Sequence, residues 1–123
     1  MNVLDVIYVE DDEQEALIMK IGMRRFEINI LHIPFITVDT LSKLSEPPYQ
    51  TAVAVLFDEM LAGESGFKLS RTLRDSGDER LIFLLTAGEN PDPALLTTQT
   101  ILFRRKPVDF EELATTIRKL SSL

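Results

Sequence analysis

The chain has 123 residues, of which 45% are hydrophobic and 27% charged, a length and composition that suit one folded domain with a single core. Its formal net charge of −7 disfavours direct binding of nucleic acid, and the absence of cysteine excludes disulfides, thiolate metal sites and cysteine nucleophiles. No apolar run reaches the roughly 20 residues that span a bilayer, and the acidic N-terminus is unlike a secretory signal, so we expect a cytoplasmic protein without a membrane partner.

Five short aliphatic runs alternate along the chain with amphipathic stretches, a pattern typical of a parallel sheet with helices on both faces. The runs cover residues 6–9, 28–33, 52–57, 81–85 and 101–103. The third and fourth are apolar throughout, as strands buried on both faces are. Pro34 lies at the end of the second run and cannot donate a ladder hydrogen bond, so we expect this strand to lie at an edge of the sheet or to be broken near that point.

The first two predicted helices lie on either side of the second strand. One begins near Asp12, whose side chain we expect to cap it, and apolar residues at spacings of three and four mark its inward face: Ala16, Met19, Met23 and Phe26. The other is short, from about Thr40 to Leu44. The single histidine, His32, lies in the intervening strand with no second histidine nearby, and we expect it to be neither a ligand nor a base.

A third helix is predicted to begin near Gly66 or Phe67, with Gly66 serving the turn before it, and to end at Gly77. Leu69 and Leu73 would face the core. The basic residues of this helix would point to water: Lys68, Arg71 and Arg74.

The last helix has the clearest pattern. Its apolar stripe consists of Phe110, Leu113, Ile117 and Leu120. Asp109 and Glu112 are three residues apart at its start, which predicts an N-cap and its reciprocal partner. Before it, Pro91 and Pro93 allow only a brief and distorted fourth helix between residues 88 and 100.

Polar side chains follow four of the predicted strands. They are Glu10, Asp11 and Asp12 after the first, Asp58 after the third, Thr86 after the fourth and Lys106 after the fifth. Since ligands of open parallel sheets bind beyond the carboxyl ends of the strands, we expect these groups to converge. Carboxylates in one crevice repel each other unless a cation joins them, and oxygen ligands without His or Cys favour Mg²⁺ or Mn²⁺.

With such an ion in place, one carboxylate can stay ionised and attack a phosphoryl group. The Lys106 ammonium would help to neutralise the charge that develops on the phosphoryl oxygens. Asp58 follows a buried strand, where a carboxylate is costly to desolvate unless it has a function or a partner. The strand-end residues therefore predict a chain that forms an aspartyl phosphate.

Four segments resemble the strand-end motifs of response-regulator receiver domains of two-component signalling, the CheY-like superfamily. They are VEDDE at 9–13, DEMLAGESG at 58–66, LTA at 85–87 and the pair Lys106–Pro107, in the family's order and at roughly its spacing over the whole chain. The resemblance implies that residues 1–123 form one receiver domain. It also implies a flavodoxin-like fold: a three-layer, doubly wound (βα)5 sandwich whose five-stranded parallel sheet has the order 2-1-3-4-5.

Carried over residue by residue, the resemblance assigns the phosphoacceptor to Asp58. Glu10 and Asp11 match the acidic pair that holds Mg²⁺, with Asp11 as the direct ligand. Met60 matches the position whose backbone carbonyl completes the metal shell. We therefore expect the metal site to consist of Glu10, Asp11, Asp58 and the carbonyl of Met60.

The resemblance also implies the residues around the phosphoryl group. Thr86 would donate a hydrogen bond to it, Ala87 would leave room for it, and Lys106 would pair with it before a cis peptide bond to Pro107. Phe103 falls at the position of the family's aromatic switch residue. The implied catalysis is the chain's own aspartyl phosphorylation and dephosphorylation.

Several positions depart from the family pattern. Glu59 stands where an apolar residue is usual, Ala62 stands where proline is usual, and the segment between Thr86 and Lys106 is about two residues short. These departures keep open an alternative, a degenerate receiver that acts as a phosphorylation-independent protein-interaction module. A haloacid-dehalogenase-like phosphatase is disfavoured, because Met60 stands where such enzymes need a second aspartate.

The resemblance implies protein partners. The phosphoryl donor would be a sensor histidine kinase or a histidine phosphotransfer protein, and the signal would pass to an output domain or a protein target. The sequence leaves a homodimer open and does not identify the donor or the output.

Overall fold

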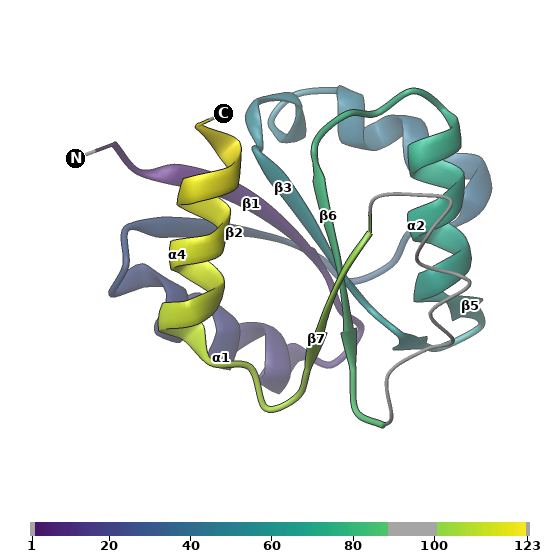
Figure 1. The fold of residues 1–123 in the computed structure, drawn as a ribbon. Coiled ribbons are helices and arrows are strands. Elements are labelled where there is room, and N and C mark those ends of the chain that lie inside the picture. Colours follow the sequence, from purple (N-terminus) through teal and green to yellow (C-terminus); the bar gives the residue numbers. More distant parts are fainter. Residues whose placement is uncertain (1, 89–100, 123) are drawn as a thin grey trace.

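A central parallel sheet with helices on both faces forms the fold in the computed structural model, which describes residues 2–88 and 101–122 (Figure 1). Its strands are β1 (Leu4–Val9), β2 (Ile28–Ile33), β3 (Ala54–Asp58), β6 (Leu81–Thr86) and β7 (Leu102–Arg105). They lie in the order β2-β1-β3-β6-β7, which is 2-1-3-4-5 when these five are numbered along the chain, and neighbours are parallel. The predicted doubly wound α/β fold is confirmed, with β2 at an edge.

The central strands β3 and β6 are buried on both faces because they are apolar up to their last residue. Every residue of β3 is buried, as are all those of β6 after Leu81. Side chains alternate between two hydrophobic clusters, so Leu56 faces one cluster and Phe57 faces the other. The polar side chains of these strands are therefore confined to the carboxyl ends, at Asp58 and Thr86.

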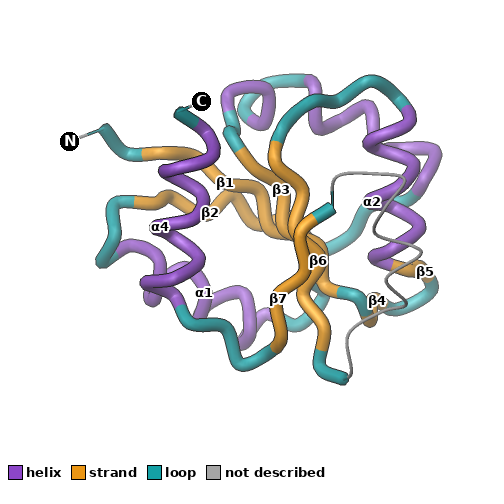
Figure 2. The backbone as a smooth tube through the Cα atoms, in the orientation of Figure 1, coloured by secondary structure: helices purple, strands orange, loops and turns teal. Residues whose placement is uncertain are grey.

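Helices cover the two faces in separate groups (Figures 1 and 2). One face packs against α1 (Glu13–Arg24) and α4 (Phe110–Ser121), and the other against α2 (Gly66–Asp75) and the 3-10 helix η1 (Val38–Ser45). A second 3-10 segment, η2 (Tyr49–Thr51), precedes β3. The short helix expected from Thr40 to Leu44 is thus present as η1, and Leu69 and Leu73 face the core as predicted.

The predicted caps are confirmed at α1 and only half confirmed at α4. The Asp12 carboxylate accepts hydrogen bonds from two backbone N–H groups of the first turn, at 2.8 and 3.2 Å. Asp109 accepts from the Glu112 N–H at 3.1 Å. The reciprocal role predicted for Glu112 is wrong, because its carboxylate instead forms two hydrogen bonds with the Arg104 guanidinium, at 2.8 and 3.0 Å. A bidentate, charge-assisted pair is stronger than one bond to a backbone N–H.

Arg74 departs from the prediction that the basic residues of α2 point to water. Its guanidinium is partly buried, and Nη1 donates to the carbonyl oxygens of Asp78 (2.8 Å) and Arg80 (2.9 Å). The reason is its place in the last turn of the helix, where the chain reverses and carbonyl groups lie within reach of a cation. Gly77 follows the helix with φ +97°, as a helix-ending glycine should.

The loop after Asp58 is a small antiparallel hairpin of β4 (Met60–Leu61) and β5 (Glu64–Ser65). Gly63 makes its turn with φ +77°, a conformation that other residues adopt only with strain. Gly66 begins α2 directly against the backbone carbonyl of Asp58, and a Cβ atom at this position would collide with that carbonyl. The structural role predicted for Gly66 is confirmed.

Within residues 2–88 and 101–122, no helix has the length and apolar character to cross a bilayer. The brief fourth helix expected between residues 88 and 100 lies outside the described part of the chain.

Candidate functional site

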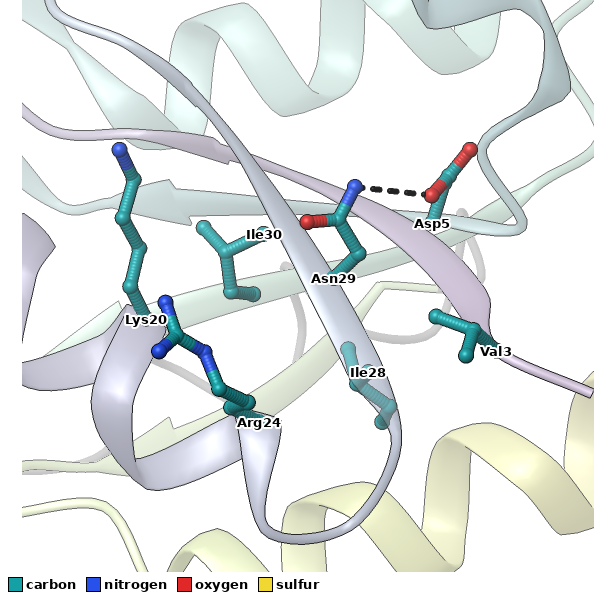
Figure 3. Close-up of a pocket in the computed structure, with 7 residues that line it drawn as sticks. All are labelled: Val3, Asp5, Lys20, Arg24, Ile28, Asn29 and Ile30. Atoms are coloured by element: carbon teal, nitrogen blue, oxygen red, sulfur yellow. Dashed lines mark hydrogen bonds between the residues drawn. The ribbon is translucent and has the colours of Figure 1, made fainter.

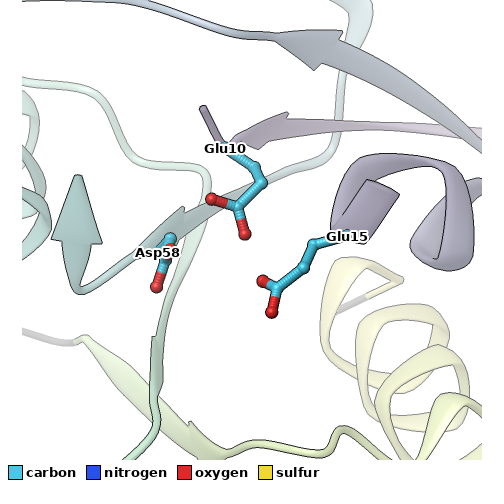
Figure 4. Close-up of side chains that lie close together, drawn as sticks. All are labelled: Glu10, Glu15 and Asp58. Atoms are coloured by element: carbon cyan, nitrogen blue, oxygen red, sulfur yellow. The ribbon is translucent and has the colours of Figure 1, made fainter. Parts of the chain in front are cut away.

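Three carboxylates from three elements meet at the carboxyl ends of the strands (Figure 4). Asp58 ends β3, Glu10 follows β1, and Glu15 stands in the first turn of α1. One carboxylate oxygen of each lies within 4.8 Å of the others. Glu10 and Asp58 are buried, whereas the Glu15 side chain is 44% exposed, so two of the three carboxyl groups are held away from water.

Lys106, which follows β7, is the cation that joins these carboxylates. Its Nζ lies 2.7 Å from Glu15 Oε2, 3.1 Å from Asp58 Oδ1 and 3.5 Å from Glu10 Oε1. Burial acts to lower the pKa of Lys106, but the contacts with Glu15 and Asp58 raise it on balance. One ammonium facing three carboxylates leaves a deficit of positive charge, which a proton or a further cation must cover.

In the absence of a further cation, Glu10 is the group that holds the proton. Burial is the largest cause that raises its pKa, to about 8, and hydrogen bonding to Glu15 and Asp58 adds to the effect against the opposing charge of Lys106. The proton on Glu10 and the Lys106 ammonium together hold the pKa of Glu15 below its usual range. The cluster is thus ready to exchange a proton for a divalent cation.

Two residues outside the predicted site contact Glu10. The Tyr8 hydroxyl donates to Glu10 Oε1 at 3.1 Å, and burial, followed by the charge of Glu10, raises the pKa of Tyr8 above its ordinary value. His32 Nε2 lies 2.6 Å from the Glu10 backbone oxygen. Both contacts fix the position of Glu10 relative to Asp58.

Asp11 lies apart from the cluster of Glu10, Glu15 and Asp58. Its side chain is exposed, and Oδ2 accepts a hydrogen bond from the Ala62 N–H at 3.0 Å. Within the hairpin, the Met60 N–H donates to Asp58 Oδ1 at 3.3 Å, while the Met60 side chain is 75% exposed. Met60 is therefore part of the hairpin after Asp58, and Asp11 contacts the same hairpin at Ala62.

Thr86 has a buried hydroxyl without a hydrogen-bond partner in the described part of the chain. It stands one position beyond Leu85, which pairs with Asp58, so it lies beside Asp58 on the neighbouring strand. The Lys106 N–H donates to the Thr86 backbone oxygen at 2.7 Å, and the peptide bond between Lys106 and Pro107 is cis, as the resemblance implies. A buried hydroxyl left without a partner costs about 1–3 kcal/mol, which favours a ligand that supplies one.

Phe103 is partly buried on β7 and packs against the hydrophobic cluster beneath α2. It therefore connects the strand that leads to Lys106 with a helix-covered face of the sheet. Its predicted part as a switch stays a prediction.

Two hollows in the described surface differ in their relation to the cluster. One of about 480 Å³ borders it and is lined by Glu15, Lys106 and Ala87 together with apolar residues. The other, of about 310 Å³, lies near the amino ends of β1 and β2, where Asn29 Nδ2 donates to Asp5 Oδ1 at 3.0 Å (Figure 3). None of the predicted site residues lines the second hollow.

The strand-end rule thus brings Glu10, Asp58 and Lys106 together and does not find Glu15. A signal for Glu15 was present, because the predicted cap at Asp12 puts Glu15 in the first turn of α1, directly after a strand end. Tyr8 was harder to find, because an aromatic residue inside a predicted strand is expected to be part of the hydrophobic core.

No protein-family model matches the chain, and no curated protein matches its sequence. Solved structures, in contrast, match over nearly the whole length. The Francisella response regulator 1452 receiver domain has a TM-score of 0.78 at 18% identity, with 97% of each chain covered. The CheY-like response regulator receiver domain protein from Methanospirillum hungatei has a TM-score of 0.72 at 22% identity, covering 96% of this chain and 94% of that one.

A DNA-binding response regulator of the LuxR family from Staphylococcus aureus is also similar, with a TM-score of 0.77 at 18% identity and coverage of 96% and 98%. These likenesses agree with the strand order and the helix-covered faces described above. The chain therefore has the fold of the response-regulator receiver domains, the CheY-like fold.

Proposed function

We propose that residues 1–123 form a receiver domain that accepts a phosphoryl group on Asp58 in a Mg²⁺-dependent reaction and converts it into a conformational signal. The observation that carries this proposal is the contact between Asp58 and Lys106, 3.1 Å apart at the ends of β3 and β7, in a fold shared with receiver domains. The Thr86 hydroxyl beside Asp58, which has no hydrogen-bond partner among the described residues, supports it independently.

The donor set fits a hard divalent cation. Glu10 and Asp58 offer carboxylate oxygens within the cluster. Asp11, which lies apart from the cluster and accepts from the Ala62 N–H, would add a third carboxylate, and Met60 its backbone carbonyl. Oxygen ligands of this kind suit Mg²⁺ or Mn²⁺. The charge deficit around Lys106 gives a physical reason for a cation here. When bound, the ion would hold the phosphoryl oxygens and neutralise their charge.

The chain's own residues would carry out the remaining chemistry. An Asp58 carboxylate oxygen would form the new bond to phosphorus while the bond between phosphorus and the donor breaks, and the donor group leaves with those electrons. Lys106 would neutralise charge on the phosphoryl oxygens, and the Thr86 hydroxyl would donate a hydrogen bond to one of them. Ala87, with its small side chain, would leave the space that these oxygens need.

The resemblance to receiver domains implies the partners. The donor would be a phosphohistidine of a sensor histidine kinase or of a histidine phosphotransfer protein. The Staphylococcus structure is that of a DNA-binding response regulator. By analogy, an output domain or protein target would receive the signal of this chain.

Intact-mass measurement tests the proposal. The wild-type chain is incubated with a small acyl phosphate and Mg²⁺, and we expect a mass gain of one phosphoryl group that Asp58→Asn eliminates. Circular dichroism of the variant checks that the fold is kept. No mass gain in the wild type would favour the phosphorylation-independent interaction module, and a gain at the wild-type rate in Asp58→Asn would move the acceptor to another residue.

A further inference from the structure

We infer that Glu15 is a positioning residue of this site, which competes with Asp58 for Lys106 and thereby strengthens cation binding while opposing the bound phosphoryl group. This inference rests on the proposed function and deepens it, because it assigns a role to a residue outside the predicted strand-end set. Glu15 reaches the cluster from α1, whereas Asp58 lies at the end of β3 (Figure 4). Lys106 follows the end of β7.

The distances favour Glu15 as the first partner of Lys106. Its Oε2 lies 2.7 Å from Nζ, against 3.1 Å for the nearest oxygen of Asp58. The Glu15 side chain is 44% exposed and that of Asp58 only 9%. Glu15 can therefore swing into water and release Lys106, whereas Asp58 is held in place by its strand.

Removing the Glu15 charge would weaken the attraction for a divalent cation in two ways. One negative charge leaves the neighbourhood of the cluster, so the local potential becomes less negative. Lys106 then pairs more fully with Asp58, and its ammonium opposes a second cation at the same oxygens. Both effects lower the affinity of the site for a divalent cation.

Removing the Glu15 charge would have the opposite effect on a bound phosphoryl group. A group with charge near −2 next to Asp58 is repelled by the Glu15 carboxylate. It is attracted more strongly by the Lys106 ammonium when Glu15 does not share that ammonium. Loss of the Glu15 charge would therefore favour the phosphorylated state. The two ligands of the site should respond to one substitution in opposite directions, which a role limited to stabilising α1 would not produce.

The experiment compares Glu15→Gln with Glu13→Gln. Glu13 lies in the same first turn of α1, is exposed, and loses the same charge on substitution, so it is a matched control. Mg²⁺ affinity is measured by titration calorimetry, and beryllofluoride affinity at saturating Mg²⁺ is measured from NMR shifts. Thermal melts verify that both variants are folded, and the ¹⁵N signal of Lys106 Nζ reports on its partner.

For Glu15→Gln we expect Mg²⁺ affinity to fall roughly fivefold and beryllofluoride affinity to rise by about the same factor, with a shifted Lys106 signal. Glu13→Gln should stay within about twofold of the wild type. Equal behaviour of the two variants, or a shift of both affinities in the same direction, would overturn the role of Glu15. A wild-type chain that binds neither Mg²⁺ nor beryllofluoride would instead overturn the proposed function itself.

Discussion

Two ion-paired clusters with similar exposure differ in whether their charges balance. Asp78 and Arg80 are 10% and 17% exposed, and Asp58 and Lys106 are 9% and 20% exposed. The Arg80 guanidinium binds Asp78 at 2.7 Å and also donates to the backbone oxygens of Leu44 (3.0 Å) and Tyr49 (2.9 Å).

Arg80 therefore satisfies its own donors, neutralises one carboxylate and ties the 3-10 segments to the start of β6. Lys106 instead faces three carboxylates, and the Thr86 hydroxyl beside it has no described partner. Burial of charge is common to both places. Only the cluster around Lys106 has an excess of carboxylates and a hydroxyl without a described partner, both of which a bound ligand would satisfy.

The largest effect of a single substitution on stability should come from the balanced cluster. Arg80→Ala leaves Asp78 without its ion-pair partner and removes the hydrogen bonds to the backbone oxygens of Leu44 and Tyr49, so we expect the free energy of unfolding to fall by about 3 kcal/mol. Urea unfolding measures this loss. The exposed Arg71 on α2 is the control, and Arg71→Ala should cost less than about 0.5 kcal/mol. A loss below about 1 kcal/mol for Arg80→Ala would mean that the balanced cluster contributes little.

The two clusters should respond to pH with opposite signs. The pKa of Glu10 is about 8 in the fold and near 4.5 in the unfolded chain, so the folded state holds an extra proton between these values. Without divalent cations, stability should therefore fall as pH rises from about 5 to about 8, by at most about 1.4 kcal/mol per pH unit. Unfolding curves at several pH values measure the slope, and Glu10→Gln should flatten it.

Asp78 should give the free energy of unfolding the opposite dependence on pH. Burial acts to raise the pKa of Asp78, but its hydrogen bonds with Arg80 lower it on balance. Its stabilisation is thus complete above its ordinary pKa of 3.8 and is lost as pH falls below that value. If the loss of stability below pH 3.8 persists in Glu10→Gln and disappears in Asp78→Asn, the assignment to Asp78 is confirmed. The same loss of stability in both variants would refute it.

Mg²⁺ should stabilise the unbalanced cluster and leave the balanced one unaffected. Ligand binding to the folded state at ten times its Kd adds about 1.4 kcal/mol. We expect this gain in thermal melts of the wild type and not in Asp58→Asn, which should be as stable as the wild type in metal-free buffer because it relieves repulsion. Equal gains in both proteins would place the cation elsewhere.

The smallest effect distinguishes two buried hydroxyls. Ser70 Oγ donates to the Gly66 backbone oxygen at 2.7 Å, whereas the Thr86 hydroxyl has no partner in the described residues. Ser70→Ala should cost about 1 kcal/mol, and Thr86→Val should be neutral or stabilising by up to about 1 kcal/mol in metal-free buffer. Chemical unfolding of both variants measures the difference. A Thr86→Val loss equal to that of Ser70→Ala would reveal a hydrogen bond that holds this hydroxyl.

The sequence predicts the sheet and most of the cluster because both follow from strand ends. Apolar runs fix where the strands lie, and the residues that follow each run then stand near the carboxyl edge, which is why Glu10, Asp58 and Lys106 could be assigned together. The fold's strand order came from the resemblance and agrees with the structure.

Contacts that depend on the reach of long side chains could not be predicted in this way. Glu15 meets Lys106 across 91 positions of the sequence, Arg80 reaches Tyr49 across 31, and Glu112 turns to Arg104 across 8. Each of these side chains has several rotamers, and the partner that it selects depends on which carbonyl or charge the tertiary packing leaves nearby. Arg74 was misassigned to solvent for the same reason.

The contact of Gly66 with the Asp58 carbonyl has a consequence for how the domain could be engineered. Because the first residue of α2 rests against the backbone of the proposed acceptor, the spacing between them is set by main-chain atoms and does not depend on a replaceable side chain. A saturation library would therefore accept only glycine at 66, while Gly63, which has open space around it, would accept residues such as asparagine that tolerate a positive φ. Grafting this site onto another scaffold would require transferring residues 58–66 as one rigid unit.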